Sequence, residues 1–380
     1  MSVTAEQITE ALRPVEDPEL RRSVVDLGMV KDIAINGDAV SVTIALTVAG
    51  CPLRAELTTR VGDAVRGLGV TDVAVEFTVM TDEERAKVTA IMGGGGHGSH
   101  AGHNHGPAGQ QAPPKPMPFR EGSKTRIIGV NSGKGGVGKS SVTVNLAIAL
   151  QQLGHDVAVL DADIYGFSIP AMLGVDQTPT VLDDMMVPPT ANGIRCISMG
   201  FFIEEDEAVI WRGPMLHKAL EQFLTDVFWD EPDFLVVDMP PGTGDVALSI
   251  SQYLPRAEIY VVTTPQPAAQ RVAQRTAAMA KKLNLPVRGV IENMSWFTGD
   301  DGKRYELFGE GGGQMLADDI GAPLLAQIPL VPELRAGGDD GTPITVTDPD
   351  AEASLAFRKL AETIVGLGAA RVFRSELKLS

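Results

Sequence analysis

Residues 133–140 have the composition and spacing of a phosphate-binding loop. They follow the short apolar run 127–130 and precede a helical pattern over 141–153, which is the order of strand, loop and helix that such a loop requires. Glycines let backbone N–H groups converge on phosphate oxygens, and the N-terminus of the following helix adds positive potential. We expect Lys139 to reach the β and γ phosphates of a nucleotide and the Ser140 hydroxyl to bind Mg²⁺. The predicted ATP contacts in this loop are Gly133, Lys134, Gly135, Gly136, Val137, Gly138, Lys139, Ser140 and Ser141.

Acidic residues follow two other apolar runs, where a phosphate site would need them. Asp161 and Asp163 follow one run, and Asp238 follows the other. Because phosphoryl transfer depends mainly on positioning and electrostatics, we expect Asp238 to contact Mg²⁺ through water and Asp163 to orient or deprotonate the attacking water. A helix-capping role stays open for Asp245 and for one of Asp161 and Asp163. The predicted catalytic residues are Lys134, Lys139 and Asp163, and the predicted magnesium-site residues are Ser140 and Asp238.

The composition of the 380-residue chain limits its partners. It has 32 Lys and Arg against 49 Asp and Glu, for a formal charge of −17, and 5% aromatic residues. Nucleic acid and anionic membranes would repel such a surface, so we expect neither as a partner. Two cysteines exclude a disulfide scaffold, and no apolar run approaches the ~18 residues of a membrane span. The polar, acidic start lacks a signal-peptide pattern, so we expect a soluble, cytoplasmic protein.

Residues 93–120 divide the chain into two predicted domains. This stretch is rich in Gly, His and Pro, and it contains no carboxylate and almost no aliphatic residue. It cannot form a hydrophobic core, so we predict a flexible linker between residues 1–92 and residues 121–380.

The first of these parts is predicted to be a small α+β domain. Alternating apolar residues indicate half-buried strands, and helical spacing indicates a helix with Pro52 as its first residue and Cys51 as its cap. The expected elements are a helix after the capping-box pair Thr4 and Gln7, a turn at Asn36-Gly37, strands over 40–48 and 73–79, and a helix over 52–67.

The second part alternates short apolar runs with segments of helix length. Such runs are typical of buried parallel strands, and their alternation with helices predicts a doubly wound, mostly parallel α/β sheet. A ligand should then bind beyond the carboxyl ends of the strands. The runs are 127–130, 157–160, 234–237, 259–262, 287–291 and 324–328.

A second lysine, Lys134, directly follows the first glycine of the loop. The pattern resembles the deviant Walker A loop of the MinD/ParA/nitrogenase-iron-protein class of ATPases. That resemblance implies that Lys134 reaches the nucleotide of a second subunit, and hence that two subunits form a homodimer around two ATP molecules. An interpretation of Lys134 as a solvated loop residue stays open.

Further motifs occur at residues 161–166, 211–215, 240–245 and 292–295, and, in the first domain, at residues 26–30 and 51–53. Together they resemble the Mrp/ApbC family of iron-sulfur cluster carriers, over nearly the whole chain. The resemblance implies that Asn293 contacts the adenine, although an asparagine at this place also fits a polar cap on a strand end. It also implies that the first domain is similar to a small domain found in iron-sulfur assembly factors.

One departure from this family concerns the cluster itself. Members usually carry a Cys-x-x-Cys pair after Glu-Asn-Met-Ser, and two subunits combine their pairs to bind a bridging [4Fe–4S] cluster. Residues 295–302 contain no cysteine. Cys51 remains a candidate because a helix N-terminus lowers the pKa of a thiol, but it is equally a small cap residue. Cys196 lies in an apolar run and is predicted to be an inert core residue.

The linker offers a second set of candidate ligands. Clustered imidazoles on a flexible chain can bind transition metals, although an unselected spacer explains the same composition. These ligands are His97, His100, His103 and His105.

The phosphate-binding loop predicts an ATPase that uses ATP and Mg²⁺. The resemblance implies that it is a slow, regulatory homodimer that transfers iron-sulfur clusters to client apoproteins or assembly factors. Two alternatives stay open: a MinD/ParA-like ATPase that organises other components in space, and an ATP-gated scaffold without metal. The segment 369–380 has only a short apolar face, which disfavours a membrane-bound organiser.

Overall fold

The computed structural model describes residues 3–48, 53–92, 117–119, 122–164, 166–183, 185–203, 213–242 and 244–370. Its packing divides the chain into two compact units. One comprises residues 1–114, 179–188 and 226–228, and the other comprises residues 115–178, 189–225 and 229–380. The predicted linker from Gly93 to Arg120 lies largely outside the described residues, so its flexibility stays a prediction.

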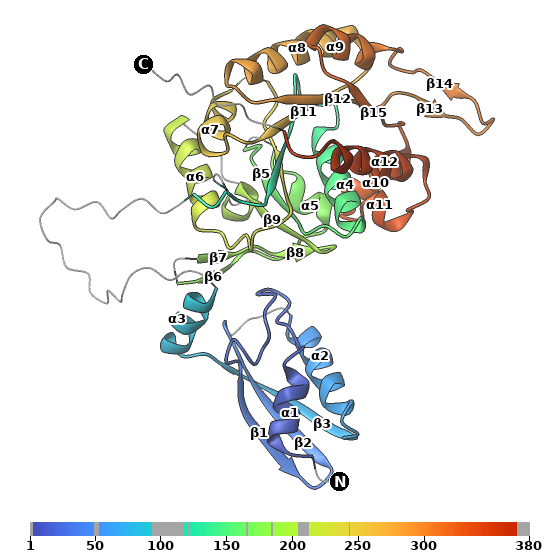
Figure 1. Ribbon diagram of the computed structural model, residues 1–380. Coiled ribbons are helices and arrows are strands. Elements are labelled where there is room, and N and C mark those ends of the chain that lie inside the picture. Colours follow the sequence, from blue (N-terminus) through green and yellow to red (C-terminus); the bar gives the residue numbers. More distant parts are fainter. Residues whose placement is uncertain are drawn as a thin grey trace, which may run out of the picture. The chain divides into compact units, whose positions relative to one another are not determined.

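The first unit is built on a three-stranded sheet in the order β1-β2-β3. β1 and β2 are antiparallel and are joined at the Asn36-Gly37 turn, whereas β2 and β3 run parallel. The expected capping box at Thr4 and Gln7 is present. The elements are α1 (Ala5–Leu12), β1 (Val30–Asn36), β2 (Ala39–Leu46), α2 (Arg54–Arg66), β3 (Asp72–Val79) and α3 (Asp82–Ile91), with the short hairpin β6 (Thr180–Leu182) and β7 (Met185–Val187) in the same unit (Figure 1).

The start of α2 differs from the prediction. The helix begins at Arg54 with Leu53 as its N-cap and no side-chain capping bond, so the expectation of Pro52 as the first residue and Cys51 as the cap is wrong. Packing fixes this end instead. Leu57 is fully buried, and the Arg54 guanidinium lies 4.9 Å from the centroid of the Phe77 ring. Cys51 and Pro52 themselves lie outside the described residues, so the effect of the helix start on the pKa of the Cys51 thiol stays a prediction.

The second unit contains an eight-stranded sheet in the order β15-β12-β11-β4-β10-β5-β9-β8. All neighbouring pairs are parallel except β8 and β9. All six apolar runs form strands, which confirms the predicted α/β sheet. The strands are β4 (Arg126–Ser132), β5 (Val157–Asp161), β8 (Thr190–Ala191), β9 (Ile194–Ser198), β10 (Phe234–Asp238), β11 (Glu258–Thr263), β12 (Val287–Glu292) and β15 (Leu324–Gln327).

Helices cover both faces of this sheet, as a doubly wound fold requires. On one face, Ile128 and Val130 of β4 share a buried core with Leu146 and Phe357 of two adjacent helices, α4 and α12. On the other face, Ile259 packs near Met279 of α8. The helices are α4 (Lys139–Gln152), α5 (Ile169–Leu173), α6 (Gly213–Thr225), α7 (Asp245–Tyr253), α8 (Pro267–Lys282), α9 (Gly312–Ile320), α10 (Pro332–Asp339), α11 (Ile344–Thr347) and α12 (Glu352–Leu367) (Figure 1). No described helix has both the length and the apolar composition to cross a membrane.

A buried ion pair joins the central strands β4 and β11 at their amino-terminal ends. Arg126 Nη2 lies 2.7 Å from Glu258 Oε2, and their side chains are 8% and 2% exposed. The Tyr260 hydroxyl donates to Glu258 Oε2 at 3.1 Å, and the backbone N–H of Ala370 donates to Oε1 at 2.6 Å. Glu258 therefore joins two central strands to the segment that follows α12.

We predict that Glu258→Ala lowers the free energy of unfolding by about 3–5 kcal/mol, because it leaves the buried charge of Arg126 unpaired. Urea unfolding followed by tryptophan fluorescence measures this change, since Trp211, Trp229 and Trp296 all belong to the second unit. Glu362→Ala on the exposed side of α12 is the control and should leave the midpoint unchanged. Equal midpoints for the two variants would contradict a stabilising role of the ion pair.

Candidate nucleotide-binding site

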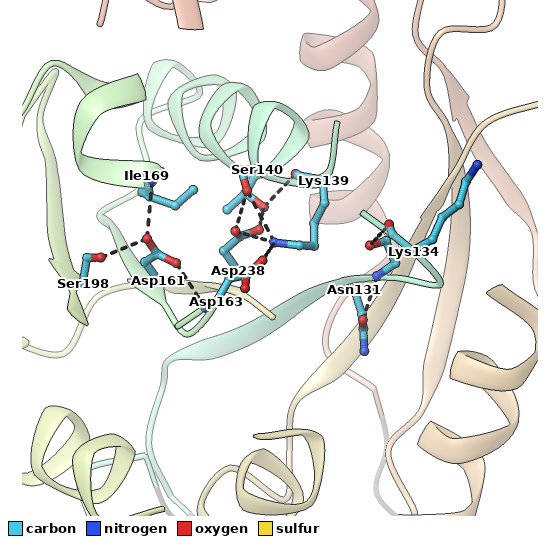
Figure 2. A network of polar contacts seen from close by, with 11 residues as sticks. Asn131, Lys134, Lys139, Ser140, Asp161, Asp163, Ile169, Ser198 and Asp238 are labelled. Carbon is cyan, nitrogen blue, oxygen red and sulfur yellow. Dashed lines mark hydrogen bonds and ion pairs between the residues drawn. The ribbon is translucent and has the colours of Figure 1, made fainter. Parts of the chain in front are cut away.

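The carboxyl ends of three adjacent strands bring the predicted site residues together. β10 lies between β4 and β5, and its last residue, Asp238, pairs in register with Val130 on one side and Asp161 on the other. The loop 133–138 follows β4 and leads into α4. This arrangement places the phosphate-binding loop beside the acids that follow β5 and β10, as Figure 2 shows.

Left-handed glycines and an asparagine shape the loop. Gly136 and Gly138 both have φ near 78°, and Gly138 is the N-cap of α4. Asn293, directly after β12, donates from Nδ2 to the carbonyl oxygen of Val137 at 2.9 Å. A Cβ atom at Gly138 would collide with that Nδ2. The structure thus places Asn293 against the loop, and its buried Oδ1 has no partner among the described residues.

Lys139 is the cation at the centre of the site. Its Nζ lies 2.6 Å from Asp238 Oδ2 and 3.2 Å from Asp163 Oδ2. Burial acts to lower the pKa of Lys139, but the negative charges of Asp238 and Asp163 outweigh burial and raise it. The ammonium is therefore fully charged at neutral pH, as a group that binds phosphate must be.

The oxygen donors around Asp238 suit a magnesium ion that is shared with a nucleotide. The Ser140 hydroxyl donates to Asp238 Oδ2 at 2.7 Å. Mg²⁺ is usually held by one or two such protein groups together with substrate phosphates and water. Across the described ranges, no group of three or more His, Cys, Asp or Glu side chains could hold a metal by itself. The donor set therefore fits Mg²⁺ bound with a nucleotide, in which Ser140 and Asp238 would hold the ion and the ion would neutralise phosphate charge.

Lys134 does not join this cluster within its own chain. Its Nζ lies 3.5 Å from Oε1 of Gln266, the N-cap residue of α8. Figure 2 shows its side chain pointing away from Lys139 and Asp238. The role of Lys134 toward a second subunit stays a prediction.

The structure distinguishes the two aspartates that follow β5. Asp161 Oδ1 accepts the backbone N–H of Asp163 at 3.2 Å, and its Oδ2 accepts the Ser198 hydroxyl at 2.9 Å. Asp161 thus holds its own loop in place, whereas Asp163 faces Lys139. Asp163 Oδ1 is buried and has no hydrogen-bond partner among the described residues, so it is the oxygen available to a reacting water. Helix α7 begins at Asp245 with Gly244 as its N-cap. The side chain of Asp245 is not among those described, so its capping role stays a prediction.

Sequence reasoning missed two hydroxyl side chains in this site. Thr143 donates to Asp238 Oδ1 at 2.6 Å, and Ser198 binds Asp161 from the neighbouring strand β9. Both residues are fully buried. Helical spacing placed Thr143 in α4 but gave no sign of its partner, which comes from a distant strand.

The structure describes only one of the candidate cluster and metal ligands, Cys196. Cys51 and the four linker histidines, His97, His100, His103 and His105, fall outside the described residues. Cys196 is fully buried in β9, and burial, with the nearby Asp161, raises the pKa of its thiol well above the usual value. This confirms Cys196 as an unreactive core residue.

The segment without the cysteine pair forms a small hairpin of β13 (Phe297–Thr298) and β14 (Arg304–Tyr305). The Arg304 guanidinium lies 4.0 Å from the centroid of the Trp296 ring. Trp296 Nε1 and Arg304 Nη2 donate to Glu352 Oε1 at 3.1 Å and 3.0 Å, and the Thr298 hydroxyl donates to Glu352 Oε2 at 2.9 Å. Side-chain contacts with the start of α12 hold this hairpin, and it offers no thiolate.

We predict that Asp161 makes stability depend on pH. Burial, and after it the charge of Asp238, raises the pKa of Asp161 to about 8, from about 4 in an unfolded chain. The folded state then binds more protons between these values, so the contribution of Asp161 is complete below about pH 4 and is lost as the pH rises towards 8. Asp161→Asn stays neutral, so its melting temperature should fall less than that of the wild type over this range.

Asp319→Asn is the matched control, because Asp319 is an exposed carboxylate on α9. Thermal unfolding of the wild type and both variants across the same pH range gives the slope of melting temperature against pH for each protein. An Asp161→Asn slope equal to that of the wild type and the control would show that Asp161 is ionised throughout.

Comparison with known proteins supplies the family. A family model described as "NUBPL iron-transfer P-loop NTPase" matches residues 123–365, and one described as "Iron-sulfur cluster assembly protein" matches residues 5–77. An iron-sulfur cluster carrier protein from Mycobacterium leprae is 46% identical over 365 residues, which cover 93% of this chain and 91% of that protein. One from Synechocystis sp. is 40% identical over 374 residues, which cover 96% and 98%.

A solved structure shares the fold of the second unit. A nucleotide-binding protein from Archaeoglobus fulgidus, in complex with ADP, has a TM-score of 0.52 and 33% identity, covering 60% of this chain and 90% of that chain. The family matches and the relatives confirm the resemblance that the motifs indicated. With the loop, Lys139 and Asp238 placed as a P-loop site requires, the chain belongs to the family of NUBPL iron-transfer P-loop NTPases.

Proposed function

We propose that this protein is an ATP-binding and ATP-hydrolysing homodimer that carries iron-sulfur clusters to target apoproteins in the cytoplasm. The observation that carries the ATPase part is the convergence of Lys139, Asp163 and Asp238 at the phosphate-binding loop. The proposed cargo follows from the relatives, which are named iron-sulfur cluster carrier proteins.

In this proposal each group at the site has a separate task. The Lys139 ammonium binds the phosphates and balances the charge that develops on them, while Ser140 and Asp238 hold Mg²⁺. Asp163 accepts a hydrogen bond, and then the proton, from the attacking water through the oxygen that has no other partner. Lys134 reaches the nucleotide of the second subunit. Hydrolysis is slow, and it switches the geometry of the dimer because ATP binds one dimer state more tightly than the other.

Cluster binding needs ligands other than the family's usual pair. Cys196 is buried and protonated, and residues 295–302 contain no cysteine. We therefore assign the cluster to Cys51 from two subunits with further ligands, and keep His97, His100, His103 and His105 as candidate metal ligands. The match of residues 5–77 to an iron-sulfur cluster assembly protein supports a role for the first unit.

One observation favours a second candidate function, an ATP-gated scaffold that holds no metal. Where the family's cysteine pair is expected, the chain has a hairpin fixed by Trp296, Arg304 and Glu352. Such a hairpin can bind a partner protein but not a cluster. The two functions differ in whether the purified protein incorporates iron and sulfide.

We predict that Lys139→Ala reduces ATP hydrolysis by about 10²- to 10³-fold, because it removes a charge that stabilises the transition state. Asp163→Asn should retain ATP binding and lose hydrolysis. Phosphate release and calorimetric ATP binding measure the two effects, with Lys282→Ala on the exposed end of α8 as the control. Full activity in either site variant would overturn these roles.

We predict that anaerobic reconstitution with iron and sulfide loads the wild type with a cluster, that Cys51→Ala abolishes loading, and that Cys196→Ala does not. Absorbance and iron counts per dimer measure incorporation. Loading that survives Cys51→Ala, and is lost only when the four linker histidines are changed to Ala, would move the site to the linker. No incorporation in the wild type would favour the scaffold.

A further inference from the structure

Thr143 makes an unusual contact for a threonine inside a helix. It lies one turn after Lys139 in α4, it is fully buried, and its Oγ1 lies 2.6 Å from Asp238 Oδ1 and 3.1 Å from the carbonyl oxygen of Lys139. Helical threonines commonly donate to the carbonyl four residues earlier, as Thr58 and Thr59 do here. A hydroxyl has a single proton, and the shorter contact is to the charged acceptor. Thr143 therefore donates to Asp238.

The two oxygens of Asp238 have different partners. Oδ2 is in contact with Lys139 Nζ at 2.6 Å and with Ser140 Oγ at 2.7 Å, and Oδ1 accepts from Thr143. Lys139 and Ser140 are the groups that phosphates and Mg²⁺ would engage. Thr143 lies outside the loop and binds the opposite oxygen, so its contact does not compete with a bound nucleotide.

We propose that Thr143 is a positioning residue that fixes the orientation of the Asp238 carboxylate and thereby sets the affinity of the site for Mg²⁺ bound with nucleotide. This inference rests on the proposed ATPase function. Asp238 is fully buried. Loss of the Thr143 hydroxyl removes the hydrogen bond that holds Oδ1, and the attraction between Lys139 and Oδ2 is then unopposed. The carboxylate can then rotate towards Lys139 and away from the magnesium position.

Three variants separate this role from simple packing. Thr143→Val keeps the size and branching of the side chain and removes the hydroxyl, and Thr143→Ala removes it with no added bulk. Thr143→Ser keeps the hydroxyl and removes only the methyl group, so it is the matched control. Calorimetric titration of the full-length protein with ADP, at increasing magnesium chloride and in EDTA, gives the magnesium dependence of binding without any turnover.

We expect Thr143→Val and Thr143→Ala to raise the magnesium concentration for half-maximal enhancement of ADP binding by about 10- to 100-fold. ADP affinity in EDTA should be unchanged, and Thr143→Ser should behave as the wild type. In an Asp238→Asn background, Thr143→Val should cause no further shift in this magnesium concentration, because Thr143 acts only through its contact with the Asp238 carboxylate.

A Thr143→Val or Thr143→Ala protein that needs the same magnesium as the wild type would overturn the inference while leaving the proposed function intact. So would a shift of equal size in Thr143→Ser, because that result would trace the effect to packing of the methyl group. A wild type that binds no ADP at any magnesium concentration would overturn the proposed function, and this inference with it.

Discussion

The ammonium of Lys139, held between Asp238 and Asp163, is the interaction on which the site depends. A buried cation is stable only beside opposite charge, and here that charge comes from the ends of two different strands. The order of the sheet makes this possible, because β10 lies between β4 and β5. The Lys139 side chain thus joins the phosphate-binding loop to the acids at the ends of two strands. A phosphate that binds Lys139 therefore changes the charge balance around both Asp163 and Asp238.

Several residues around this ion pair have no catalytic role themselves but hold the groups of the site in place. Asp161, held by Ser198, keeps the loop that carries Asp163 in place, and Thr143 holds the far oxygen of Asp238. Asn293 binds the loop from β12 and requires a glycine at position 138. Each contact fixes a group that a nucleotide would touch, and such preorganisation is the main source of catalysis in phosphoryl transfer.

The chain has the phosphate-binding residues of a P-loop NTPase but no cysteine in residues 295–302, which follow the motif at 292–295. Trp296, Arg304 and Glu352 hold this segment by stacking and hydrogen bonds. Such contacts give a defined surface but no thiolate for a cluster. The proposed nucleotide site and the proposed cargo ligand, Cys51, therefore belong to different units.

The sequence by itself determined the features that neighbouring residues encode. These include the six central strands, the α+β character of the first unit, the phosphate-binding loop, and the position of Lys139, Asp163 and Asp238 after buried strands. Tertiary structure alone decided the partners of Thr143, the difference between Asp161 and Asp163, and the start of α2 at Arg54. The reason is physical: periodicity and loop composition act over a few residues, whereas Thr143 and Asp238 are 95 positions apart. Only the order in which the strands pair brings such residues together.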